Sequence, residues 1–244
     1  MTFSYAGSAL AIREDLASAH ARIWDRLGSP GTWLDAARRV AVAAETRNAS
    51  RCRLCRDRKA ALSPSAVDGR HDSLGELPEN WIEVIHRIAT DPARLTQIWY
   101  RRMLTTGLGD AEYVEIVGVL AHVTAIDTFA RGLGLSPQPL PEPKGGAPSR
   151  YRPAEARQHD YWVPTIAWDE HGPNEADYFV GNPSNIRTAM SLVPDETRSF
   201  FILSANQYLP GPAMRDFSRE YRAITHRQIE LLAGRISALN RCLY

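Results

Sequence analysis

One segment constrains the fold of this chain more than any other. Residues 112–132, EYVEIVGVLAHVTAIDTFARG, are apolar on almost every side of a helix. Such a helix has to be covered by other elements, because its apolar surface is unfavourable in water. The pattern therefore predicts the central helix of a bundle, or a helix at a subunit interface. Its longest apolar stretch, 116–126, is about half as long as a membrane span and contains His122 and Thr124, so we expect no membrane helix here.

Helical signals also mark most of the remaining chain. Apolar residues recur at three- and four-residue spacings, with capping residues between them, and alternating strand patterns do not recur. We therefore expect an all-α fold, and the lack of strands argues against a thioredoxin fold. Thr32 and Asp110 are the expected caps of the second and central helices, and 63–79 is an expected loop. Besides 112–132, the predicted helices cover about 9–27, 32–50, 80–89, 92–105, 183–192, 195–208 and 224–244.

A proline-rich segment divides the chain. Residues 135–153 read LSPQPLPEPKGGAPSRYRP, in which neither a helix nor a central strand persists. We therefore predict a helical domain at 1–134, a linker at 135–160 and a second helical half at 161–244. Aromatic residues between 161 and 179 are expected to pack the connector onto the helices.

The overall charge is nearly balanced. The 244 residues are 44% hydrophobic and 23% charged, and 29 Lys and Arg against 28 Asp and Glu give a net charge of +1. This composition predicts a folded protein and gives no support to nucleic-acid or membrane partners. The first residues, MTFSYAGSALAIRED, carry acids where a secretory leader has bases, so we expect a cytoplasmic protein.

The cysteines suggest thiol chemistry. Cys52 and Cys55 form a Cys-Arg-Leu-Cys motif inside the basic run 51–59, and Cys242 lies near the last residue. Positive charge and a helix N-terminus both favour a thiolate, and the Cys-x-x-Cys spacing lets one thiol attack while the other resolves. The plain alternative is a pair of small half-buried side chains. Zinc is disfavoured at this stage, because no second Cys-x-x-Cys or His pair stands at ligand spacing.

A redox cysteine also needs a proton acceptor. Lys59 stabilises a thiolate one turn beyond Cys55, but an ammonium group does not accept the proton. The candidates are Glu45, seven residues before Cys52, and the pair Glu115 and His122 on one face of the central helix. A histidine in an apolar run is more often a core residue whose hydrogen bonds are satisfied.

Two stretches of the chain resemble one another. ARRVAVAAETRNASRC ends at Cys52, and RQIELLAGRISALNRC ends at Cys242 with Glu230 twelve residues before it. The second resembles the signature helix of the AhpD-like (alkylhydroperoxidase and carboxymuconolactone decarboxylase-related) superfamily: Glu, eleven residues, Cys-x-x-Cys, three residues, His. The first copy has Val40 and Lys59 where the family has Glu and His. The second stops at Tyr244, one residue before its second cysteine, which suggests that the natural reading frame continues.

The resemblance implies an AhpD-like bundle of two related helical halves that forms a homo-oligomer. It implies an antioxidant, thiol-dependent peroxidase in which Cys55 reduces a hydroperoxide, Cys52 resolves it and an external dithiol restores the pair, without metal, haem or flavin. Glu230 and Cys242 are the corresponding candidates in the second copy, against a solvated charge and an unreactive helix-end thiol. Two alternatives remain: a degenerate scaffold that binds a partner or small ligand, and a cysteine-independent lyase that uses Glu115 and His122.

Overall fold

The computed structural model describes residues 3–180 and 184–242, and over these ranges the chain is helical. A single bridge between Arg157 and Thr165 is the sole strand-like pairing in the described ranges. The all-α prediction is therefore confirmed. The helices are α1 (Glu14–Leu27), α2 (Ala36–Ala49), α3 (Arg53–Ala60), α4 (Glu79–Thr90), α5 (Gln97–Thr105), α6 (Asp110–Gly132), α7 (Asn185–Thr188), α8 (Pro194–Gln207) and α9 (His226–Leu239), with 3-10 turns at Pro64–Ala66, Pro92–Arg94 and Ala213–Arg215.

Several helix starts differ from the sequence predictions. Asp35, not Thr32, caps α2, and its carboxylate accepts the N–H of Arg38 at 2.8 Å. Asp110 is the first residue of α6 rather than its cap, because the cap position falls on Gly109. In both helices the cap position therefore differs from the one that the spacing of apolar residues indicates.

The predicted helix boundaries also need correction in three other places. The expected helix 92–105 is a 3-10 turn followed by α5, which starts after Thr96, whose hydroxyl accepts the N–H of Trp99 at 3.2 Å. The helix expected at 183–192 is reduced to Asn185–Thr188, and its first expected residue lies outside the described residues. The last helix ends at Leu239, and residues 243–244 also lie outside the described part.

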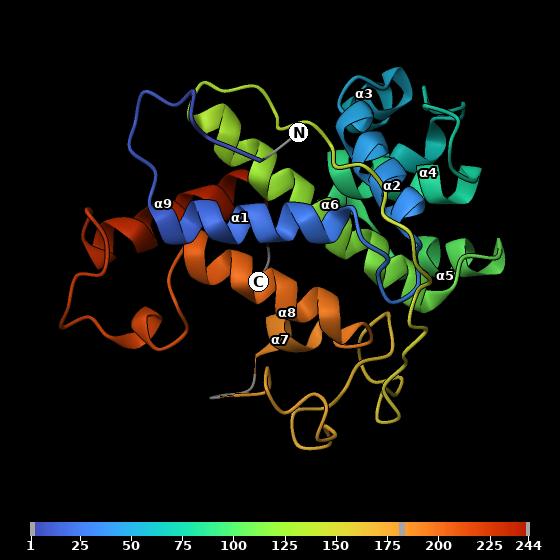
Figure 1. Cartoon of the computed structure of the whole chain (residues 1–244). Coiled ribbons are helices and arrows are strands. Elements are labelled where there is room, and N and C mark those ends of the chain that lie inside the picture. The colour runs from blue at the N-terminus through green and yellow to red at the C-terminus, as the bar shows by residue number, and fades with distance from the viewer. Residues whose placement is uncertain (1–2, 181–183, 243–244) are drawn as a thin grey trace.

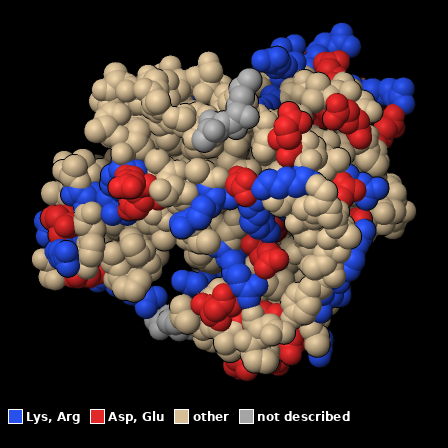
Figure 2. Space-filling model, viewed as in Figure 1, with Lys and Arg blue, Asp and Glu red and all other residues tan. Residues whose placement is uncertain are grey.

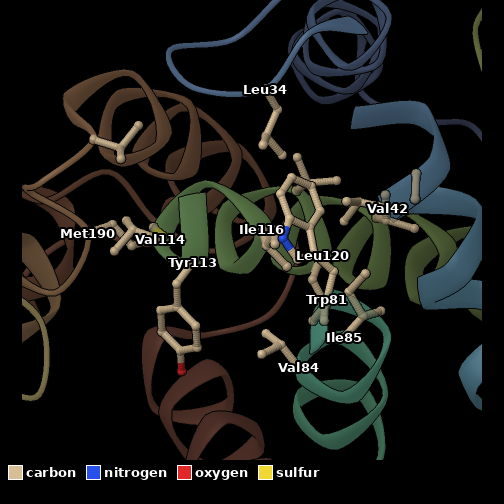
Figure 3. Packing of buried hydrophobic residues seen from close by; sticks show 14 of the residues in the cluster. Leu34, Val42, Trp81, Val84, Ile85, Tyr113, Val114, Ile116, Leu120 and Met190 are labelled. Atoms are coloured by element: carbon tan, nitrogen blue, oxygen red, sulfur yellow. The ribbon is translucent and has the colours of Figure 1, made fainter. Parts of the chain in front are cut away.

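The long helix α6 forms the centre of the bundle, as its composition predicted. Ile116, Val119 and Ile126 on this helix are completely buried, and α2, α4 and α8 pack against it. Figure 3 shows Val114 of α6 beside Met190, and Ile116 and Leu120 of the same helix near Trp81 of α4. By length and composition α6 would also cross a bilayer, but most of its apolar segment is buried in the protein. It is therefore the core helix of a bundle.

The proline-rich connector runs over the helices without a helix of its own (Figure 1). Pro139 accepts a hydrogen bond from the indole of Trp24 at 2.7 Å, and Arg150 donates its N–H to the carbonyl of Thr32 at 2.8 Å. Beyond the connector, Leu192 and Leu203 join the same hydrophobic core as α2, α4 and α6. The division into two related halves stays a prediction.

The charged residues are dispersed over much of the surface. On the face shown in Figure 2, acidic and basic side chains are interspersed, with a concentration of basic side chains over α3. Helix α3 carries Arg53, Arg56, Arg58 and Lys59. This distribution agrees with the nearly neutral total charge.

Candidate metal centre

Two thiols and two imidazoles converge beside the N-terminus of α3. The side-chain ligand atoms of Cys52, Cys55, His71 and His86 all lie within 4.8 Å of one another. The Cys55 sulfur is 3.2 Å from Nδ1 of His86 and 3.4 Å from Nδ1 of His71, and the Cys52 sulfur is 3.5 Å from the same His71 atom. Both imidazoles therefore present Nδ1 to the sulfurs.

The cysteines are positioned by the junction between α2 and α3. Cys52 is the extended residue that precedes α3, and Cys55 lies in the first turn of that helix. The three-residue spacing therefore places both sulfurs on one side of the helix start. The Asp72 carboxylate accepts the N–H of Arg53 at 2.8 Å and so caps α3, which holds the loop that contains His71 against the cysteines.

Each histidine is anchored by a carboxylate at its other ring nitrogen. Nε2 of His71 lies 2.8 Å from Glu83, and Nε2 of His86 lies 2.7 Å from Glu45. A carboxylate accepts a hydrogen bond from Nε2–H of a neutral imidazole, and the lone pair of Nδ1 is then directed at the sulfurs. This is the tautomer that a metal-ligating imidazole requires.

The two carboxylates are themselves held in place. Glu83 accepts hydrogen bonds from Arg58 at 2.8 Å and from the indole of Trp99 at 3.1 Å. Glu45 accepts the side-chain amide of Asn48 at 2.9 Å and the backbone N–H of Leu74 at 3.0 Å. The orientation of both imidazoles is thus fixed by a shell that extends over α2, α3, α4, α5 and the intervening loop.

Burial and hydrogen bonding push the two thiols in opposite directions. Burial, and after it the neighbouring Cys52, raise the pKa of Cys55 to about 12. Burial also acts to raise the pKa of Cys52, but the hydrogen bonds from the Cys55 N–H, His71 and the Asp72 N–H outweigh it and lower that pKa. Without a bound ion, Cys52 is therefore the more acidic thiol.

The surrounding histidines and Glu83 complete the electrostatics. Burial works against a charged His71, but the bond to Glu83 and the nearby Cys52 sulfur raise its pKa overall. Burial lowers the pKa of His86, and the bond to Glu45 offsets this in part. The pKa of Glu83 falls to about 2, because His71, Arg58 and Trp99 outweigh its burial.

A hollow lies on the outer side of His71. It has a volume of about 360 Å³ and is lined by residues of the loop and of α4, including His71, Glu83 and Ile82. The side chain of His71 is 7% exposed, whereas that of His86 is fully buried. The hollow therefore reaches the imidazole of His71, and this ring separates it from the sulfurs.

The structure joins some of the predicted site residues and separates others. Glu45 belongs to the cluster, but it acts on Cys55 through His86 rather than directly. Lys59 is exposed in the last turn of α3, and the basic group that acts on the Cys55 thiol is Arg58. The sequence argument against zinc rested on spacing along the chain, but in the fold His71 from a loop and His86 from α4 lie beside the two cysteines. Their sequence signal was weak: His71 and His86 are single histidines far apart in the chain.

Glu115 and His122 lie in a different buried cluster. Arg39 donates to Glu115 and, at 2.8 Å, to Glu196; Glu196 also pairs with Arg26 at 2.8 Å, and Nδ1 of His122 lies 3.6 Å from it. Burial lowers the pKa of His122 to about 4. These ion pairs tie α1, α2 and α6 to α8, which indicates a structural role.

The residues of the second motif copy also lie outside the group formed by Cys52, Cys55, His71 and His86. Glu230 pairs with His226 of its own helix at 3.2 Å and accepts a hydrogen bond from Tyr208. Cys242 is exposed beyond the end of α9. Their proposed catalytic role therefore stays a prediction.

Comparisons with known proteins give no relative. No family model, no curated protein and no solved structure matches the chain. The resemblance to the AhpD-like superfamily is therefore an expectation from the sequence alone.

Proposed function

We propose that this chain is a zinc-binding protein, with Cys52, Cys55, His71 and His86 as the four ligands. The observation that supports this proposal most strongly is that these four ligand atoms all lie within 4.8 Å of one another. Cys₂His₂ is one of the standard ligand sets of structural zinc, and the donor set excludes the hard cations, which take oxygen ligands.

The measured spacings fit a tetrahedral ion. Zinc bonds of about 2.3 Å to sulfur and about 2.0 Å to nitrogen put neighbouring sulfur and nitrogen atoms about 3.6 Å apart. Three of the four sulfur-to-nitrogen distances in the cluster are 3.2, 3.4 and 3.5 Å, and the fourth is at most 4.8 Å. Small side-chain adjustments would bring the four ligand atoms to bonding distance from one zinc ion.

The second shell supports the same assignment. Metal-ligating histidines usually donate their other ring N–H to a carboxylate or carbonyl, and both histidines here face a carboxylate at Nε2. Two independent carboxylate–imidazole pairs aimed at one pair of sulfurs are difficult to explain by packing alone. With four protein ligands, the ion has no open position, so we propose a structural role.

The structural role follows from what the ligands connect. Cys52 and Cys55 belong to the start of α3, His71 to a long loop and His86 to α4. Apart from Leu77, the loop from Ala61 to Pro78 has no fully buried residue, so apolar packing gives it little support. An ion bound by all four side chains clamps this loop to the helices on both sides.

Cobalt substitution tests the proposal. Protein purified under reducing conditions and freed of metal is titrated with Co²⁺, whose tetrahedral thiolate complexes have strong visible and charge-transfer bands. We expect these bands to saturate at about one ion per chain and to disappear on zinc addition. Octahedral spectra, or no saturable spectrum, would rule the centre out.

A second candidate is the dithiol oxidoreductase that the sequence resemblance implies. The observation that favours it is the Glu83–His71–Cys52 chain, which lowers the pKa of the Cys52 thiol in the metal-free state. In this alternative a Cys52 thiolate attacks the peroxide oxygen, releasing an alcohol and leaving a sulfenic acid. Cys55 then displaces water to form a disulfide, which an external dithiol reduces.

In this alternative the order of the two thiols is the reverse of the one that the resemblance implies, because the pKa of Cys55 is raised and that of Cys52 is lowered. The two functions are separable by peroxide consumption in metal-free and zinc-loaded protein. Turnover by the metal-free form that zinc abolishes would support the dithiol alternative. No turnover by either form, with tight zinc binding, supports the structural centre.

A further inference from the structure

Two adjoining cavities lie away from the metal centre, along the face of α6. The first has a volume of about 510 Å³ and extends from Asp91, which follows α4, to Arg241, which lies just beyond the end of α9. The second, of about 520 Å³, extends from the end of α2 to Pro137. Ala89 and Thr124 line both, so the two cavities form one groove, which we call the α6 groove.

The α6 groove has an apolar floor. Ile88 and Leu120 from α4 and α6 line the first cavity together with Leu239 of α9, and Val123 and Pro137 line the second. Each cavity has the size typical of small-molecule sites, which combine an apolar lining with a few polar groups. The floor is suited to the hydrocarbon or aromatic body of a ligand.

The rim of the α6 groove carries an excess of positive charge. Two acidic residues line it, and both form ion pairs. Asp91 pairs with Arg94 at 2.7 Å, and Asp127 accepts bidentate hydrogen bonds from Arg47 at 2.8 Å. Four further cations line the groove, and none of them forms an ion pair within residues 3–180 and 184–242: Arg51, Lys59, Arg131 and Arg241.

This concentration stands out in a chain whose net charge is +1. Like charges around one hollow repel one another and raise the local concentration of anions. We propose that the α6 groove binds an amphipathic organic anion, a carboxylate with an apolar body of fatty-acid type. The carboxylate is bound at the cationic rim, and the apolar body lies along the α6 floor. This binding site is independent of the zinc proposal, since none of the four metal ligands lines it.

Fluorescence titration with 11-(dansylamino)undecanoate tests the proposal. We expect saturable binding that dodecanoate reverses, whereas dodecanol and dodecyltrimethylammonium, which have the same chain without the negative charge, compete weakly. Equal competition by the cationic analogue, or no saturable binding, would overturn the proposal. Competition by inorganic phosphate as strong as by dodecanoate would also overturn it, because phosphate has no apolar body.

Matched variants locate the bound probe. Thr124 is exposed on α6 and lines both cavities, so Thr124→Trp fills the groove with little risk to the fold and should abolish binding of the probe. The control is Thr105→Trp, at an exposed position of α5 outside the groove. Arg131→Gln should weaken binding by about fivefold, the effect of one ion pair at a partly exposed site. Arg101→Gln, which lies outside the groove, should leave the affinity unchanged. Probe binding that survives Thr124→Trp and Arg131→Gln would place it elsewhere and contradict the proposal.

Discussion

The carboxylate of Glu45 lies 2.7 Å from Nε2 of His86 in the interior of the bundle. The opposite ring nitrogen of His86 lies 3.2 Å from the Cys55 sulfur. The pair therefore connects α2 to the sulfurs at the start of α3 through α4. In the zinc proposal, Glu45 fixes both the tautomer and the orientation of a metal ligand.

Replacing Glu45 tests this role. We expect Glu45→Gln to weaken zinc affinity by about 10- to 100-fold, the usual effect of removing a second-shell carboxylate, while the stoichiometry stays the same. Competition with a chromophoric chelator measures the affinity. Glu76→Gln is the matched control, because Glu76 is an exposed residue of the loop that contains His71. Equal affinities of the two variants would show that Glu45 does not support a ligand.

The order of thiol reactivity is a separate prediction. In metal-free protein we expect iodoacetamide to modify Cys52 faster than Cys55, because the pKa of Cys52 is lowered and that of Cys55 is raised to about 12. A Cys242→Ser background removes the exposed third thiol, and mass spectrometry of peptides gives the rates. Faster labelling of Cys55 would contradict the arrangement of hydrogen bonds around the pair.

The buried ion pairs of Arg39 give a stability prediction. Its side chain is 2% exposed and faces Glu115 and Glu196. Arg39→Met leaves the buried Glu115 without its cationic partner and Glu196 with Arg26 alone, so we expect the free energy of unfolding to fall by about 3 to 5 kcal/mol. Arg38→Met removes only an exposed pair with Asp35 and should change it by less than about 1 kcal/mol. Urea unfolding of both variants checks the difference.

His20 gives a pH prediction. Burial lowers its pKa to about 4, against about 6.5 in the unfolded chain. The unfolded state therefore binds the proton first, and stability should fall as the pH decreases from about 6.5 to about 4, by about 3 kcal/mol in total. Above pH 6.5 this contribution is constant.

The contribution of His20 is isolated by comparing slopes. Unfolding free energies of wild type and His20→Gln are measured across this pH range. The free energy of unfolding of the variant should fall less steeply with decreasing pH than that of the wild type, while any acid release of zinc affects both proteins alike. Parallel curves for the two proteins would show that His20 is not held neutral by the fold.

Much of the fold was predictable from the sequence, because it depends on periodicity. The apolar segment 112–132 indicated a central helix, and α6 occupies that position with Ile116 and Ile126 completely buried. Boundaries were less accurate, since caps depend on local geometry: Asp35 rather than Thr32 caps α2. The extended connector was also predicted, because its closely spaced prolines prevent helix formation.

The candidate site was predictable only in part. The Cys52 and Cys55 pair and Glu45 are local in sequence, so their proximity follows from helix geometry. His71 and His86 reach the sulfurs only after the loop before α4 has folded back, and no spacing rule encodes that return. Glu115 and His122 share a helix face as expected, but Arg39 and Glu196 from other helices turn that face into a network of ion pairs.

Metal analysis of the purified protein tests the central claim most directly. Zinc content is measured by plasma mass spectrometry after expression in zinc-supplemented medium, in wild type, Cys52→Ser, His86→Gln and Cys242→Ser. We expect about one zinc ion per chain in wild type and in Cys242→Ser, and less than about a tenth of that in the two ligand variants. Wild type without zinc, or ligand variants that retain it, would contradict the account.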